Sequence, residues 1–141
     1  MTSNLTYKGQ NMFPEILQQL TELSKEMDKA IELNPKNVNA HVSRAISYYY
    51  SPESFGGSKP RAFEMLKKAV EIDTLADSPH IWLALFYLDS GQKDDALREI
   101  RLARSANPDR VFTNYVYSQV EAAMKKSAIK KRNGPAANKD N

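Results

Sequence analysis

Two histidines, His41 and His80, are the side chains best suited to metal binding in this chain, which contains no cysteine. They stand 39 residues apart at matching places in two similar segments, so stacked copies of one structural unit would bring them close together. Zinc also needs one or two further protein ligands, and Asp77 is the nearest candidate along the sequence. Because the spacing supplies no clear third ligand, we expect both histidines to fill core positions and expect no metal and no other cofactor.

Carboxylates are numerous but offer no evident pairing of an acid with a base. Most fall on the polar faces of predicted helices, where solvation and salt bridging are the default: Glu22, Glu26, Glu32, Glu64, Glu71, Asp94, Asp95 and Glu99. A catalytic nucleophile would need a neighbouring base and a third group that orients this base. The sequence contains no such triad, so we expect a protein that is not an enzyme.

A segment rich in serine and glycine, residues 50–59, is predicted to be a loop between two helices. Its run Gly56-Gly57-Ser58-Lys59 is superficially similar to a phosphate-binding loop. That motif, however, requires a glycine, four intervening residues and then Gly-Lys-Ser/Thr, placed between a strand and a helix. We expect instead that Pro52 ends one helix, that the glycines turn the chain and that Phe55 packs onto the core.

The elements that would position these residues come from an internal repeat. The segment HVSRAISYYY, from His41, aligns with HIWLALFYLD, from His80, and a second apolar stretch follows each of them. In these second stretches small, large and small residues recur at i, i+4 and i+7, as Ala62, Leu66 and Ala69 and again as Ala96, Ile100 and Ala103. Such residues share one helix face, and alanines let two antiparallel helices approach closely. The chain is therefore predicted to be all-α and built from antiparallel helix hairpins.

Six helices are predicted, near residues 14–33, 38–50, 60–73, 79–90, 93–106 and 110–131. Pro14 is assigned to the first turn of its helix, where the missing N–H has no partner to lose. The first helix carries an apolar stripe of Ile16, Leu20, Leu23, Met27 and Ala30.

The second copy of the repeat resembles a tetratricopeptide repeat. Residues 77–110 carry that family's succession of leucine, small residue, tyrosine, turn glycine, alanine, large apolar residue, alanine and proline: Leu83, Ala84, Tyr87, Gly91, Ala96, Ile100, Ala103 and Pro108. The first copy, 38–76, departs from the pattern at Arg44, where leucine is expected, and through a Phe-Gly-Gly insertion similar to those of bacterial members. The resemblance implies one domain over residues 1–132, with hairpins stacked in a short right-handed superhelix, and a flexible tail at 133–141.

The resemblance also implies a function and a site. In this family the first helix of each hairpin lines a concave groove, and the matching positions are Val42, Ile46, Tyr49, Tyr50, Ile81, Leu85, Leu88, Phe112 and Tyr115. Since these side chains are apolar or aromatic, the expected function is a scaffold that binds a protein or peptide partner. Three occupants of the groove fit this composition: an amphipathic segment of a partner, a second copy of the chain, or the chain's own residues 1–33. An apolar small ligand is an alternative cargo.

Charge is concentrated at the C-terminus. The chain carries a formal charge of +3, whereas residues 125–141 contribute +5 and the remaining residues −2. Such a tail could serve as an adaptor for nucleic acid or an anionic membrane surface. A solvated, frayed chain end has the same composition, and we favour this second interpretation. No apolar run is long enough to span a membrane and the first residues do not form a signal peptide. The predicted location is the cytoplasm, with a mature exported or periplasmic form as the alternative.

Overall fold

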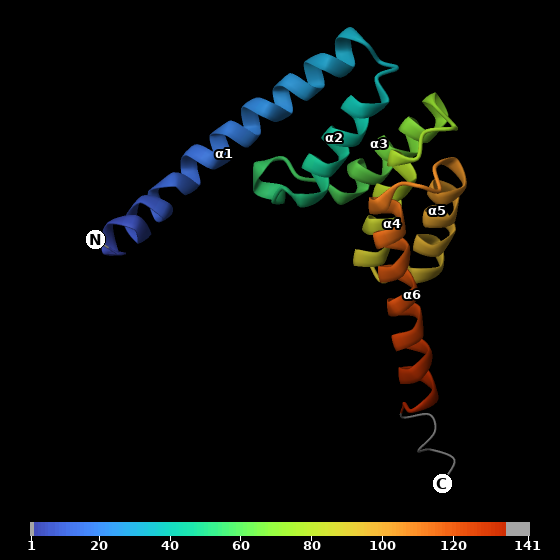
Figure 1. Cartoon of the computed structure of the whole chain (residues 1–141). Coiled ribbons are helices and arrows are strands. Elements are labelled where there is room, and N and C mark those ends of the chain that lie inside the picture. The colour runs from blue at the N-terminus through green and yellow to red at the C-terminus, as the bar shows by residue number, and fades with distance from the viewer. Residues whose placement is uncertain (1, 135–141) are drawn as a thin grey trace. The chain divides into compact units, whose positions relative to one another are not determined.

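The computed structural model describes the backbone of residues 2–134 and the side chains of residues 14–134. Over this range the chain forms six α-helices and one short 3₁₀ turn, and it contains no strand. The helices are α1 (Thr2–Leu33), α2 (Val38–Tyr50), α3 (Lys59–Ile72), α4 (Ser78–Asp89), α5 (Lys93–Ala106) and α6 (Val111–Arg132), and η1 (Glu53–Phe55) is the 3₁₀ turn (Figure 1). The prediction of an all-α fold is confirmed.

Helices α2 to α6 begin and end within one residue of their predicted bounds, whereas α1 does not. It starts at Thr2, so Pro14 lies inside the helix and the prediction of a start at Pro14 is wrong. A proline removes its own N–H and crowds the carbonyl one turn earlier. Both effects are confined to the turn around Pro14. The residues before it can therefore still form helical hydrogen bonds, and the helix continues back to Thr2.

The chain forms two compact units, Met1–Ile72 and Asp73–Asn141, and the second unit begins four residues before the second predicted repeat, which starts at residue 77. In the first unit, α1 packs against α2, and α2 pairs with α3. The small-large-small residues Ala62, Leu66 and Ala69 of α3 are fully buried. Their burial is what the close approach of two helices requires.

In the second unit, α4 pairs with α5, and α6 packs against both. A cluster of fully buried residues joins the three helices: Ile81, Ala84, Ala96, Ile100, Ala103, Val116 and Val120. The alanines predicted from the repeat thus lie where the helices meet. None of the described helices combines the length and the apolar character needed to cross a lipid bilayer.

The C-terminal basic residues continue α6 as far as Arg132, and Asn133 caps the helix end. Lys125, Lys126, Lys130, Lys131 and Arg132 are therefore helical and exposed. Of the predicted flexible tail, residues 135–141 lie outside the described residues.

Candidate functional site

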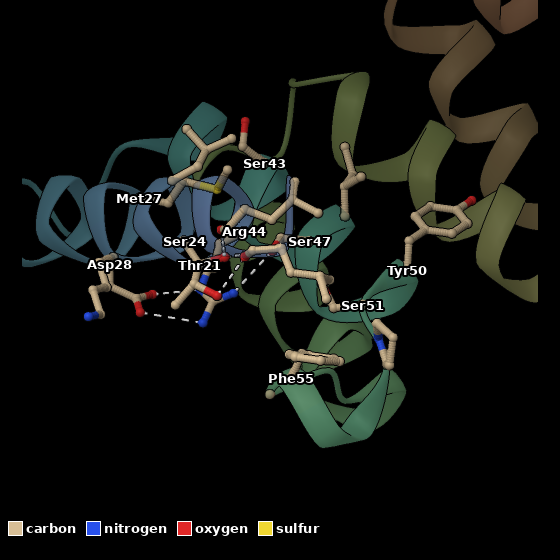
Figure 2. Close-up of a pocket in the computed structure, with 17 residues that line it drawn as sticks. Thr21, Ser24, Met27, Asp28, Ser43, Arg44, Ser47, Tyr50, Ser51 and Phe55 are labelled. Carbon is tan, nitrogen blue, oxygen red and sulfur yellow. Dashed lines mark hydrogen bonds and ion pairs between the residues drawn. The ribbon is translucent and has the colours of Figure 1, made fainter. Parts of the chain in front are cut away.

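A cleft of about 510 Å³ lies within the first unit, between α1, α2 and the loop that follows α2 (Figure 2). Its apolar walls come from three places in the chain. Leu17, Leu20, Leu23 and Met27 belong to α1, Ile46 and Tyr50 to α2, and Pro52 and Phe55 to the loop. Ligand pockets have this range of volumes and this mainly apolar lining.

A polar network joins α1 to α2 at one side of the cleft. Arg44 Nε donates to Asp28 Oδ1 at 2.8 Å, and Arg44 Nη1 donates to Ser47 Oγ at 3.3 Å. The Oγ atoms of Ser24 and Ser47 are 3.0 Å apart, and Figure 2 shows these groups gathered between the two helices. The Arg44 guanidinium also lies 3.8 Å from the centre of the Tyr48 ring, a cation–π contact.

This network explains why arginine occupies the place where the repeat pattern expects leucine. The Arg44 side chain is 12% exposed, so its charge is largely shielded from water, and Asp28, 54% exposed, balances it. Arg44 therefore links α2 to α1 through its ion pair with Asp28. A ligand in the cleft would meet apolar walls beside an ion pair whose two charges already satisfy each other.

The apolar stripe predicted for the first helix is half covered. Met27 and Ala30 are half-buried, whereas Ile16, Leu20 and Leu23 are 44%, 48% and 47% exposed. The hydroxyls of Thr21 and Ser24 donate to carbonyl oxygens one turn earlier in α1, so they satisfy their own helix. The exposed part of the stripe is therefore an apolar surface that faces water unless a binding partner covers it.

The loop after α2 presents Phe55 at the edge of this cleft. Phe55 is 54% exposed, so the prediction that it packs onto the core is wrong. The loop folds back on the end of α2, because Gly57 N donates to Pro52 O and Ser58 N donates to Tyr48 O, both at 2.9 Å. Gly57 approaches Ser51 so closely that a Cβ would lie 1.8 Å from the Ser51 carbonyl oxygen. This tight return holds Phe55 away from the core.

The structure separates the residues that the family resemblance assigned to the groove. Ile46 and Tyr50 line the cleft. Val42 and Tyr49 are buried with Ala45, because their spacing of i, i+3 and i+7 forms the face of α2 that is turned to the interior. The Tyr49 ring meets the Phe63 ring of α3 edge-on, with centroids 6.2 Å apart. Val42 and Tyr49 therefore offer no surface to a partner, contrary to the prediction.

The predicted residues of the second unit divide in the same way. Ile81 is buried in the core cluster, which corrects its assignment to an open surface. Leu85 and Leu88 are partly buried against that cluster, whereas Phe112 and Tyr115 are exposed on α6. The Phe112 ring lies 5.8 Å from the ring of Trp82.

Both histidines are buried, as predicted. Nδ1 of His80 lies 2.7 Å from Oε2 of Glu99, and Nε2 of His41 lies 2.8 Å from the carbonyl oxygen of Pro35. Since a carbonyl can only accept, Nε2 of His41 carries a proton. Among the residues that the structure describes, no three histidine, aspartate or glutamate side chains gather into a group that could hold a metal ion.

Comparison with models of known protein families and with curated proteins finds no match to this chain. The geometry of the cleft therefore carries the functional argument. The sequence pointed to two of its wall residues, Ile46 and Tyr50, through the family resemblance. Periodicity also predicted the apolar stripe of α1, but it did not indicate which residues of that stripe would stay exposed.

Proposed function

We propose that this chain is a non-catalytic binding module that holds an apolar helical segment of a protein in the cleft between α1 and α2. The observation that carries the proposal is the exposed apolar wall of this cleft, formed by Leu20 and Leu23 of α1 and Phe55 of the loop after α2. An amphipathic helix buries such a surface with side chains spaced at i, i+3 or i+4, and i+7.

The chemistry of the cleft supports a protein segment over a charged ligand. Arg44 and Asp28 neutralise each other and Lys25 is the one other charged side chain in the lining that the structure describes, so the cleft holds no cluster of like charges that would favour an ion. The resemblance to tetratricopeptide repeats supports the same conclusion, because repeats of that family act as scaffolds for protein partners. The membership in that family is itself part of this proposal.

A carboxylate in the wall of the cleft tests the proposal. We expect Ile46→Glu to reduce partner capture from native lysate by about tenfold or more, because a buried contact at the centre of an interface commonly contributes this much. Circular dichroism should show unchanged helical content. Leu75→Glu is the matched control, because Leu75 is a well-exposed leucine outside the cleft. Equal capture by Ile46→Glu and Leu75→Glu would exclude the cleft as the binding site.

A small apolar ligand is the alternative occupant, and native mass spectrometry separates it from a protein. A lipid in the cleft would add a defined mass to the purified wild-type chain, and Ile46→Glu would lose this mass. Under the proposal the purified chain carries no such increment.

A further inference from the structure

The apolar stripe of α1 has the spacing of a helix-pairing seam. Ile16, Leu20, Leu23 and Met27 follow one another at intervals of four, three and four residues, which is the heptad pattern. With 32 residues α1 is about 48 Å long, whereas the 13 residues of α2 span about 20 Å. Because of this difference α1 runs well past α2 (Figure 1). The seam residues Ile16, Leu20 and Leu23 stay exposed.

We propose that a second copy of this chain supplies the helical segment, by pairing its α1 antiparallel with this α1. The inference rests on the proposed function, since it names the occupant of the same cleft. The register that sets Ile16 opposite Met27 of the partner also sets Leu20 opposite Leu23 of the partner. Each layer of the seam then joins two apolar side chains, and the two-fold axis repeats both layers.

This register is self-complementary, as an interface between identical copies must be. In this register Ile16, which lies outside the cleft, packs on Met27 of the partner, and Leu20 and Leu23, which are exposed and line the cleft, pack on each other across the pair. Each copy thus fills the partner's cleft beside Ile46 and Phe55, and the same contact removes both exposed surfaces from water. One continuous interface would thus cover both the part of α1 that extends past α2 and the open cleft.

The charges beside the seam are compatible with this pairing. Glu26 comes to lie next to Gln19 of the partner, and Ser24 next to Leu17 of the partner, so no like charges meet at these flanking positions. Glu15 comes nearest to Asp28 of the partner. That carboxylate already forms an ion pair with the Arg44 of its own chain, which offsets the repulsion.

Disulfide trapping tests the orientation directly, because the chain has no cysteine of its own. In the proposed register residue 16 faces residue 27 of the partner. The two copies of residue 16 are about 16 Å apart along the helix axis, too far for a disulfide, whose Cα atoms lie within about 7 Å. We expect an equal mixture of Ile16→Cys and Met27→Cys chains to form a cross-linked dimer under mild oxidation, and either variant alone to form none. A mixture of Ile16→Cys with Lys29→Cys is the control, because Lys29 lies off the seam.

Light scattering completes the test. The wild-type chain should be a dimer, and Leu20→Glu should be a monomer with unchanged helical content. Cross-linking of Ile16→Cys with itself would indicate a parallel pair and overturn the proposal. A monomeric wild type whose partner capture depends on Ile46 would also overturn it, yet leave the proposed function standing. A monomer whose capture is unaffected by Ile46→Glu would remove both.

Discussion

Thr113 illustrates how a single polar atom can limit the stability of the second unit. Its side chain is fully buried in α6, and its Oγ1 has no hydrogen-bond partner within the described part of the chain. A buried hydroxyl without a partner costs free energy, because its hydrogen bonds to water are lost and not replaced.

We therefore expect Thr113→Val to stabilise the protein. Valine has nearly the shape of threonine, so it removes the polar atom and leaves the packing intact. The free energy of unfolding should rise by about 1 kcal/mol, measured by urea denaturation. Thr113→Ala is the control: it leaves a small cavity and should lower stability. A destabilised Thr113→Val variant would mean that the hydroxyl has a stabilising partner, such as a buried water.

Among the elements, α1 docks on α2 partly through the ion pair of Arg44 with Asp28, and Arg44 also contacts Ser47 and Tyr48 of its own helix. Arg44→Leu would restore the leucine of the repeat pattern but lose the contacts with Asp28 and Ser47 and the stacking on Tyr48. We expect a loss of about 1 kcal/mol, because the half-exposed Asp28 weakens the ion pair. The loss should be largest for α1, as faster hydrogen exchange of its amides. Arg98→Leu breaks the exposed pair with Asp95 and should leave exchange in α1 unchanged.

The sequence was sufficient to predict the hairpins, because their determinants are local. Alanines at i and i+7 around a large residue specify where two helices approach, and Pro35, Pro52 and Gly91 each follow the end of a helix, whereas Pro14 lies inside α1. The site was harder to predict. Its position depends on the docking of α1, which relies on Arg44 reaching Asp28 sixteen residues away in the sequence. Periodicity does not encode such a contact, and it also does not indicate which face of α2 is turned to α3, so Val42 and Tyr49 were assigned to the wrong surface.

At the scale of the whole molecule, the second unit has a core of its own. The cluster around Ile81, Ile100 and Val116 draws on α4, α5 and α6, all of which lie after residue 72. The superhelical stacking implied by the family resemblance stays a prediction. Because this core lies within one segment of the chain, its independence from the first unit can be tested on a fragment.

We expect residues 73–134 to fold when produced as a separate fragment. Their three helices bury one continuous cluster, and single-core domains of about 60 residues can fold alone. Thermal unfolding followed by circular dichroism should be cooperative. The same fragment with Ile100→Ala should melt at a lower temperature, because the substitution leaves a cavity in the core. A gradual, non-cooperative loss of helix in the unsubstituted fragment would show that the second unit depends on the first.

If the cleft beside Phe55 binds a protein segment, a photoreactive group at that position should become attached to it. The photoreactive residue p-benzoylphenylalanine would replace Phe55, whose ring it resembles, and in a control chain it would replace Glu64, which is exposed on α3. After irradiation in native lysate, we expect a covalent adduct with a protein chain, either a second copy or another protein, at position 55 and a much weaker one at position 64. Equal labelling at both positions, or none at position 55, would contradict it.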